Sequence, residues 1–257
     1  EKIELTIITY FVIVTSSIVR SWCGKNANSA LRFDMSDKII IVTFGDSITE
    51  AAVGLSLDQR WPVLLEKKLN NSERAEYCVI NSGVGGNTSR EGLARIDRDV
   101  ISHKPDIVLV EFGGNDIVAD EKREVSLEEY RSNLKAIHEK LADIDAEMIS
   151  LTFTPVINNW CSDGKHEKYT PSGGLDEFIE LYRDATREFA KEQGLKLIDV
   201  DLALRKACDK LSQEEIILKD GCHLTAKANK INAETVYDYL KGFSSKCTDY
   251  VHLFGKK

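Results

Sequence analysis

Short apolar runs alternate with amphipathic segments along most of this chain, and this alternation limits the folds that the chain can adopt. The apolar runs show little alternation of polar and apolar residues, as expected for strands that are buried on both faces. They are Lys38–Phe44, Tyr77–Asn81, Asp106–Glu111, Met148–Phe153 and Leu195–Val200. Strands that alternate with helices form a parallel sheet that the helices cover. We therefore predict an α/β fold with a parallel sheet of about five strands.

The segments between these runs carry apolar residues at helical spacing. In the first of them Trp61, Leu64, Leu65 and Leu69 fall on one helix face. The predicted helices are Trp61–Leu69, Arg90–Ile101, Ser126–Leu141, Asp176–Gln193 and Thr225–Leu240. In a doubly wound sheet, reactive groups collect outside the carboxyl ends of the strands. The loops that follow the strands are therefore the predicted location of a functional site.

The composition is typical of one globular domain with its own core. Of the 257 residues, 42% are hydrophobic and 30% are charged. The formal net charge of −8 argues against binding to nucleic acid, which calls for a basic face. The six cysteines are widely spaced without a C-x-x-C pair, so they do not indicate a zinc or redox site. We expect free or buried thiols in a reducing compartment.

Residues 1–34 are predicted to be an N-terminal extension of uncertain role, outside a globular domain over residues 35–257. The apolar run from Ile7 to Val19 is shorter than the ~20 residues that span a bilayer. The acidic residues near the start do not fit the positive end of a signal peptide. An extra strand over Glu4–Val14 is the alternative. We expect a cytoplasmic address, with export or membrane tethering as the alternative if residues 1–34 are native.

Four short segments are rich in polar residues and glycine. Three of them follow the first three predicted strands, and the fourth precedes the last predicted helix. They are Gly45-Asp46-Ser47-Ile48-Thr49, Asn81-Ser82-Gly83-Val84-Gly85-Gly86-Asn87-Thr88, Gly113-Gly114-Asn115-Asp116 and Asp220-Gly221-Cys222-His223. A serine hydroxyl is a weak nucleophile until a base takes its proton, and a tetrahedral oxyanion must be met by preorganised donors. The three-residue spacing of Asp220 and His223 lets the carboxylate bond one ring nitrogen while the other nitrogen faces a serine. Together the segments supply the parts of an acyl-transfer site.

These segments resemble the motifs of the SGNH, or GDSL, hydrolase family, and the resemblance covers roughly residues 38 to 240. It implies a flavodoxin-like three-layer α/β/α sandwich, with residues 35–257 as the catalytic domain. Gly92-Leu93-Ala94-Arg95 and the stretch from Val108 to Asp116 are similar to the bacterial thioesterase, arylesterase and lysophospholipase branch of the family.

The resemblance also implies a role for each motif residue. Ser47 would be the nucleophile, and Asp220 and His223 would complete the catalytic triad. The oxyanion would be bound by the amides of Ser47 and Gly86 and by the side chain of Asn115. No cofactor and no metal are implied, and the expected ligand is a small-molecule ester.

Each segment alone also has a plainer interpretation. The glycines after the second strand could indicate dinucleotide binding, but Thr88 stands where the third glycine should be. Gly113-Gly114-Asn115-Asp116 could be an ordinary turn. Asp46 is expected to accept backbone hydrogen bonds that hold the serine turn. No G-x-S-x-G sequence occurs, which argues against the nucleophile elbow of α/β-hydrolases.

The predicted activity is that of a serine esterase or acylhydrolase that cleaves short-chain carboxylic esters through an acyl-enzyme on Ser47. The main alternative is a carbohydrate O-acetylesterase, because the polar excursion Pro155–Gly174 could line a sugar site. Within it Trp160 is the candidate substrate-binding residue, since an aromatic ring could pack against an acyl chain or stack on a sugar.

Two rivals belong to other classes. A metal-dependent phosphoesterase could use Asp46, Asn115, Asp220 and His223 as ligands for divalent ions, although the chain lacks the further histidines of a two-metal centre. A non-catalytic binding module is disfavoured because every chemical part is present. No nucleic acid is expected as a partner, and membrane contact is expected only through the N-terminal segment. The acyl length, the alcohol group, the oligomeric state and any cysteine pairing are not set by the sequence.

Overall fold

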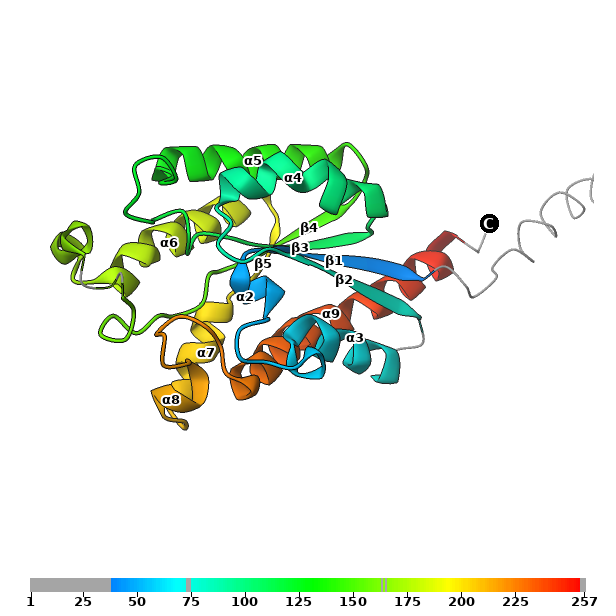
Figure 1. Ribbon diagram of the computed structural model, residues 1–257. Helices are drawn as coiled ribbons and strands as arrows, with labels where there is room; N and C mark the ends of the chain where they lie inside the picture. The colour runs from blue at the N-terminus through cyan, green and yellow to red at the C-terminus, as the bar shows by residue number, and fades with distance from the viewer. Residues whose placement is uncertain (1–37, 73–74, 163, 165, 255–257) are drawn as a thin grey trace, which may run out of the picture. The chain divides into compact units, whose positions relative to one another are not determined.

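One parallel sheet forms the centre of the unit that begins at Lys38 (Figure 1). The computed structural model describes residues 38–72, 75–162, 164 and 166–254. The strands are β1 (Ile39–Gly45), β2 (Tyr77–Gly83), β3 (Ile107–Glu111), β4 (Glu147–Leu151) and β5 (Lys196–Ile198). Their order in the sheet is β2-β1-β3-β4-β5, and every neighbouring pair is parallel. The predicted α/β fold with about five parallel strands is confirmed.

Helices cover both faces of the sheet. The longer helices are α3 (Trp61–Ser72), α4 (Ser89–Asp99), α5 (Leu127–Ala142), α6 (Leu175–Gln193), α7 (Val200–Cys208) and α9 (Ala226–Phe254). The short ones are α2 (Ser47–Glu50), α8 (Gln213–Ile216) and the 3-10 turns η1 (Leu57–Gln59), η2 (Ile101–His103) and η4 (Glu167–Ser172). Figure 1 shows α4, α5 and α6 on one side of the sheet and α3, α7 and α9 on the other. The three layers are those of the predicted sandwich.

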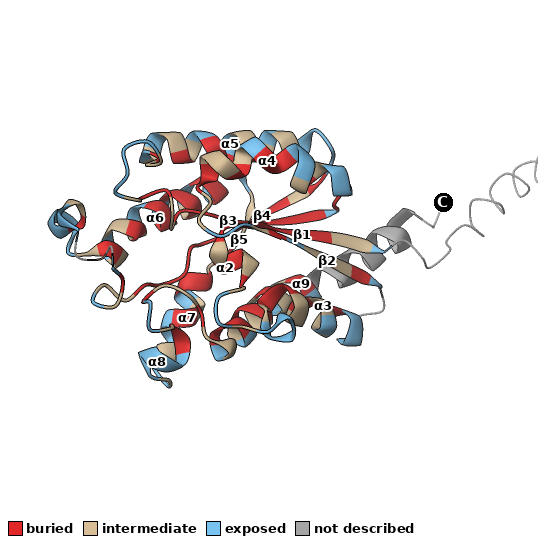
Figure 2. Ribbon diagram, viewed as in Figure 1, coloured by how far each residue is buried: buried red, intermediate tan, exposed pale blue. Residues whose placement is uncertain are grey.

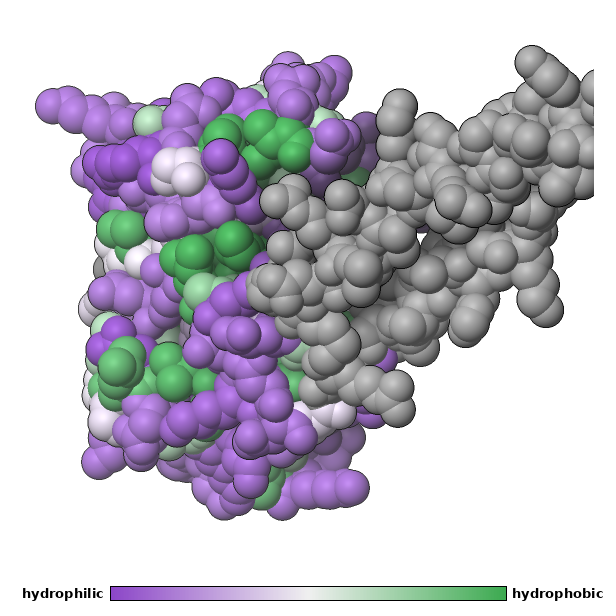
Figure 3. Space-filling model, turned by 90° about the vertical axis from the view of Figure 1, so that its right-hand side faces the viewer, coloured by the Kyte–Doolittle hydropathy of each residue, from purple (hydrophilic) through white to green (hydrophobic). Residues whose placement is uncertain are grey.

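Buried residues concentrate where the helices face the sheet (Figure 2). All five residues of β3 are buried, and β1 is buried from Ile41 to Gly45. Such continuous burial explains why the strand sequences lack polar alternation. On the face shown in Figure 3, hydrophilic side chains predominate and the hydrophobic residues form separate small groups.

Several element boundaries differ from the sequence prediction, most of them by one or two residues. The fifth strand ends at Ile198 rather than Val200, because the Asp199 carboxylate accepts a hydrogen bond from the Leu202 N–H (3.0 Å) and caps α7. The apolar character of Val200 fits the buried face of α7 as well as it fits a strand. The last helix runs on beyond the predicted Leu240 to Phe254.

The strand order places three motif loops together. β1 lies between β2 and β3, and Gly45 at its end is in register with Gly83 on one side and with Glu111 on the other. The chain therefore leaves these three strands at one edge of the sheet, at the point where the strand order reverses. This is the edge where the sequence predicts a functional site.

The predicted extension over residues 1–34 and the alternative strand over Glu4–Val14 lie outside the described residues. The boundary at residue 35 therefore stays a prediction. Among the described helices, none is long and apolar enough to cross a bilayer.

Candidate active site

Ser47 is the first residue of α2, directly after β1. Asp46 caps this helix, and its Oδ1 accepts a hydrogen bond from the Ile48 N–H at 2.9 Å. The first amides of a helix have no intrahelical acceptor, so the Ser47 N–H stays available to a ligand. As predicted, Asp46 holds the serine turn.

Ser47, His223 and Asp220 form a continuous hydrogen-bonded chain. The His223 Nε2 lies 3.0 Å from the Ser47 Oγ, and its Nδ1 lies 2.8 Å from the Asp220 Oδ2. The other carboxylate oxygen of Asp220 accepts the backbone N–H groups of Cys222 (3.0 Å) and His223 (2.9 Å). Burial alone would raise the pKa of Asp220, but these backbone bonds and the histidine ring outweigh it, so the pKa lies below its ordinary value. This geometry lets the histidine accept the serine proton.

The loop that carries His223 is braced on both sides. The Leu218 N–H donates to the His223 carbonyl (2.7 Å), and the Ile157 N–H donates to the Gly221 carbonyl (2.8 Å). Gly221 has a φ of +82°, and a Cβ there would lie 2.6 Å from the Cys161 nitrogen. A side chain at position 221 would therefore displace the histidine loop.

The second motif forms a tight turn against the serine. The Asn87 N–H donates to the Val84 carbonyl at 3.1 Å, and Gly86, the third residue of this turn, has a φ of +78°. A Cβ built on Gly85 would lie 3.7 Å from the Cβ of Ser47. No acceptor for the Gly86 N–H is found among the residues that the structure describes. This amide is free to meet an oxyanion beside the serine.

Asn115 follows β3 and approaches the serine turn from the other side. Its Nδ2 donates to the Asp46 Oδ2 at 2.9 Å, which leaves the second hydrogen of the amide for a ligand. The adjoining Asp116 is fully buried and accepts the Ser89 backbone N–H at 3.0 Å. Asp116 therefore anchors the loop, while Asn115 faces the site.

Arg95, on α4, ties these loops together from below. Its guanidinium donates to the carbonyls of Gly45 and Ser82, each at 2.8 Å, and to the Asn87 side chain at 2.7 Å. It also stacks over the Phe44 ring, with 4.7 Å between the guanidinium carbon and the ring centroid. Arg95 appears in the sequence analysis only within a family-like stretch, because its contacts depend on the packing of α4.

Three acidic side chains are buried beneath the serine. Burial raises the pKa of Asp46 to about 7 and that of Asp116 to about 6. Burial and the neighbouring charge of Asp46 raise the pKa of Glu111 well above its ordinary value. The Glu111 Oε2 accepts a hydrogen bond from the Thr49 hydroxyl at 2.8 Å. Glu111 is not among the residues that the motifs predict, although a charge at the end of an apolar strand is a signal of such a buried acid.

The buried acids predict a pH dependence of stability. A carboxyl whose pKa is raised by folding keeps its proton at a pH where the unfolded chain has lost it. Its stabilising contribution is complete below about pH 4 and is lost as the pH rises through the folded values of about 6 and 7. We expect the free energy of unfolding to fall between about pH 4 and 7, by about 1.4 kcal/mol per pH unit for each proton retained.

Denaturant titrations of Glu111→Gln test this expectation. The amide keeps an oxygen for the Thr49 hydroxyl and cannot ionise, so the unfolding free energy should depend less steeply on pH than in the wild type. Glu139→Gln, at an exposed position with 64% of its side chain accessible, is the matched control and should keep the wild-type slope. An unchanged slope in Glu111→Gln would contradict the prediction.

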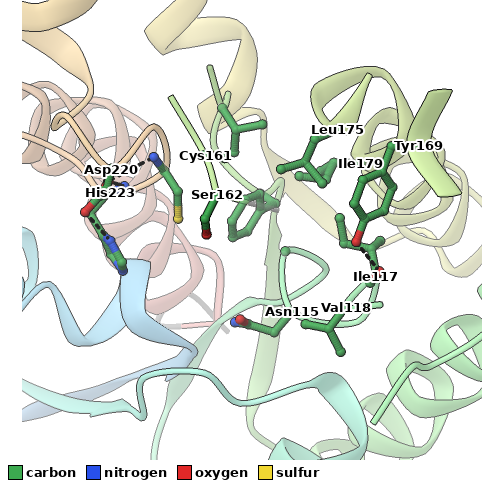
Figure 4. A pocket seen from close by; sticks show the side chains of 14 residues that line it. Asn115, Ile117, Val118, Cys161, Ser162, Tyr169, Leu175, Ile179, Asp220 and His223 are labelled. Atoms are coloured by element: carbon green, nitrogen blue, oxygen red, sulfur yellow. Dashed lines mark hydrogen bonds and ion pairs between the residues drawn. The ribbon is translucent and has the colours of Figure 1, made fainter. Parts of the chain in front are cut away.

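A cavity of about 250 Å³ opens beside Asn115 and His223 (Figure 4). Its walls are largely apolar. They include Ile117, Val118, Phe153, Val156, Leu175 and Ile179. Cys222 also lines it, and burial raises the pKa of that thiol well above its ordinary value. In the described part of the chain Trp160 is not among the lining residues, and it packs half-buried against the core instead.

The geometry also bears on the dinucleotide-binding and metal-site interpretations of the motifs. Thr88, which stands in place of the third glycine of a dinucleotide fingerprint, caps α4 and forms a capping box with Glu91. Within residues 38–254, apart from the undescribed positions, no group of three or more His, Cys, Asp or Glu side chains has the arrangement of a metal site.

The parallel sheet covered by helices and the loops that converge at its edge place the chain among hydrolytic enzymes with a three-layer α/β/α fold. The family model of the GDSL-like lipase/acylhydrolase family matches residues 43–231, so the chain belongs to this family. It is a carboxylic ester hydrolase by this membership.

Individual relatives extend the comparison. The chain is 29% identical over 220 residues to the uncharacterized lipoprotein YqeF of Bacillus subtilis (strain 168). This alignment covers 77% of this chain and 88% of that protein. It is 25% identical over 224 residues to an arylesterase of Vibrio mimicus, with 87% and 96% covered. The acetylxylan esterase Axe2 from Geobacillus stearothermophilus has a TM-score of 0.63 at 21% identity, covering 79% of this chain and 93% of that one. This last likeness shows a shared fold.

Proposed function

We propose that the protein is a serine esterase that hydrolyses short-chain carboxylic esters through an acyl-enzyme on Ser47. The observation that carries the proposal is the hydrogen-bonded chain from the Ser47 Oγ through His223 to Asp220, with distances of 3.0 and 2.8 Å. His223 takes the hydroxyl proton as the oxygen attacks the ester carbonyl, and then gives it to the departing alcohol. A water molecule, activated in the same way by His223, then attacks the acyl-enzyme and releases the acid.

Three donors are placed to bind the negative oxygen of the tetrahedral intermediate. They are the N–H groups of Ser47 and Gly86 and the free hydrogen of the Asn115 amide. Asp46 holds the Asn115 amide by one hydrogen bond of 2.9 Å, so little reorganisation is needed as charge develops. Asp220 sets the histidine tautomer and stabilises its charged form.

The apolar cavity supports the choice of substrate class. About 250 Å³ can hold a short acyl chain but not a long one in full extension. Asn115 and His223 line this cavity, and the His223 Nε2 lies 3.0 Å from the Ser47 Oγ, so an acyl group bound there would have its carbonyl near the serine.

A carbohydrate O-acetylesterase remains the second candidate. Ser162 and Tyr169, both from the polar excursion Pro155–Gly174, line the same cavity, and the Tyr169 hydroxyl donates to the Ile117 carbonyl at 2.9 Å. An acetylxylan esterase shares the fold, which is a reason to include acetylated sugars among the substrates. Trp160, which lies away from the cavity walls, would take part only by contacting a larger alcohol group.

A substrate panel and a covalent label test the proposal together. A fluorophosphonate should modify Ser47, as located by mass spectrometry of peptides. Nitrophenyl esters from acetyl to palmitoyl should show the highest kcat/KM for the short chains. Faster turnover of acetylated xylo-oligosaccharides than of nitrophenyl acetate would favour the second candidate. The absence of both labelling and hydrolysis would refute the serine mechanism.

The cellular address needs a separate measurement. Similarity to a protein named as a lipoprotein supports export or tethering as the alternative to the cytoplasmic prediction. Fractionation of cells that express the native gene product would distinguish the two.

Substitution of Asn115 should slow the chemical step. Asn115→Ala removes one oxyanion donor and is expected to lower kcat by ~100- to 1000-fold. Asn115→Asp should be slower still, because an ionised carboxylate would face both the developing oxyanion and the Asp46 carboxyl at close range. Steady-state kinetics on nitrophenyl acetate measure the order. If alanine is the worse substitution, the electrostatic role of Asn115 is wrong.

A further inference from the structure

We propose that Glu50 and Arg123 are positioning residues that hold the Gly86 amide in place at the oxyanion site, an inference that rests on the proposed esterase function. The central peptide of the turn links Gly85 to Gly86, and its N–H is the proposed donor. Two glycines at the centre of a turn resist rotation of the peptide between them only weakly, because neither has a Cβ to restrict its backbone. Contacts from outside the turn must therefore hold it in place beside the serine.

Glu50 fixes the peptide that precedes the central one. Its Oε2 accepts a hydrogen bond from the Gly85 N–H at 2.9 Å. Glu50 is the last residue of α2, the helix that begins with Ser47, so one short element carries both the nucleophile and the anchor of the oxyanion turn. The Asn81 side chain ties the same helix end to β2, since its Nδ2 donates to the Glu50 carbonyl at 3.2 Å.

Arg123 fixes the peptide that follows the central one. Its guanidinium donates to the Gly86 carbonyl at 2.5 Å and lies 3.3 Å from the Glu91 Oε2. The side chains of Arg123 and Glu91 are 42% and 43% exposed, so their ion pair contributes little to stability. The hydrogen bond from Arg123 to the Gly86 carbonyl is the contact that affects the oxyanion turn.

The two contacts fix the place of the Gly86 N–H relative to the serine. With the peptides on both sides held by side chains from α2 and from the loop before α5, the turn cannot move away from Ser47 without breaking one of these bonds. An oxyanion hole depends on donors that are oriented before charge develops. Loss of either anchor should therefore reduce kcat while KM changes little, which is not expected of a side chain that only stabilises the fold.

Glu50→Ala and Arg123→Ala test the inference with esters hydrolysed by the wild type. Each should lower kcat about tenfold, and the double variant should approach the ~100-fold loss expected for one missing oxyanion donor. Glu50→Gln keeps an acceptor for the Gly85 N–H and should restore most of the turnover. Binding of a boronic acid, whose tetrahedral serine adduct places an oxygen in the oxyanion site, should weaken by the same factors as kcat. Arg131→Ala, at another partly exposed ion-paired arginine, and Glu139→Ala should behave as the wild type.

The outcomes separate the inference from the proposed function. If the wild type hydrolyses esters and Ser47→Ala does not, while Glu50→Ala and Arg123→Ala keep full turnover, the positioning roles are refuted and the esterase stands. If the wild type neither hydrolyses esters nor reacts with a fluorophosphonate, both are refuted. A Glu50→Gln variant as slow as Glu50→Ala, with an unchanged melting temperature, would also refute the role assigned to that hydrogen bond.

Discussion

Replacement of Ser47 by alanine is expected to lower ester turnover by ~10⁴-fold or more and to abolish fluorophosphonate labelling. The substitution removes the one oxygen that lies 3.0 Å from the His223 Nε2. The remaining groups could still bind an ester and polarise its carbonyl, but no acyl-enzyme could form. Burst kinetics with nitrophenyl acetate would show this directly, because the rapid first release of nitrophenol should disappear.

The fold should tolerate this change. Ser47 is only partly buried, and the helix that it begins is capped by Asp46 rather than by the serine hydroxyl. The melting temperature of Ser47→Ala should therefore stay close to that of the wild type. Ser132→Ala, on the exposed surface of α5, serves as a control for loss of a serine hydroxyl and should keep full activity. Residual turnover of Ser47→Ala within tenfold of the wild type would mean that another group is the nucleophile.

The convergence of the motif loops follows from sequence order and sheet geometry. In a parallel sheet the carboxyl ends of all strands lie at one edge, so residues that follow neighbouring strands meet there. Once β1, β2 and β3 were recognised, the loops of Ser47, Gly86 and Asn115 could be placed together. The fourth loop, with His223, could not be placed by this argument, because it precedes a helix and follows no strand.

The supporting residues were harder to find from the sequence. Arg95 donates to the carbonyls of Gly45 and Ser82 and to the Asn87 side chain, which belong to two separate motif segments, and these contacts depend on the distance between α4 and the sheet. Glu50 and Arg123 act on the turn of Gly86 across 35 and 37 positions of the chain. Local pattern describes one element at a time, so contacts between elements appear only in the assembled fold.

Residue character alone does not predict where the fifth strand ends or where the Trp160 side chain lies. The apolar run that ends at Val200 predicts a strand there, but the capping carboxylate of Asp199 starts a helix at this position. Trp160 was selected for its aromatic ring within a polar excursion. Its side chain packs half-buried against the core, while other residues of that excursion line the cavity. A buried aromatic ring gains more by packing than by exposure, whichever role its neighbours have.

Asp220→Asn is expected to reduce kcat by ~10⁴-fold with little change in KM. In the wild type the Asp220 Oδ2 accepts a hydrogen bond from the His223 Nδ1–H at 2.8 Å, which leaves the Nε2 unprotonated toward Ser47. The Oδ1 accepts two backbone N–H groups, so the oxygen of an asparagine would keep that position and its NH₂ group would face the histidine ring. The ring would then accept at Nδ1 and carry its proton on Nε2, where it cannot take the serine proton.

The pH dependence distinguishes this tautomer effect from a loss of structure. Because the pKa of Asp220 lies below its ordinary value, its charge is present across neutral pH and its stabilising contribution is lost only as the pH falls through that lowered value. Asp220→Asn should therefore be slow at every pH from 6 to 9, whereas partial unfolding would show as a lower melting temperature. Asp238→Asn, an exposed aspartate paired with Lys241, is the matched control. If Asp220→Asn turns over within tenfold of the wild type, the histidine must be oriented by its backbone loop alone, and the carboxylate contributes neither tautomer control nor charge.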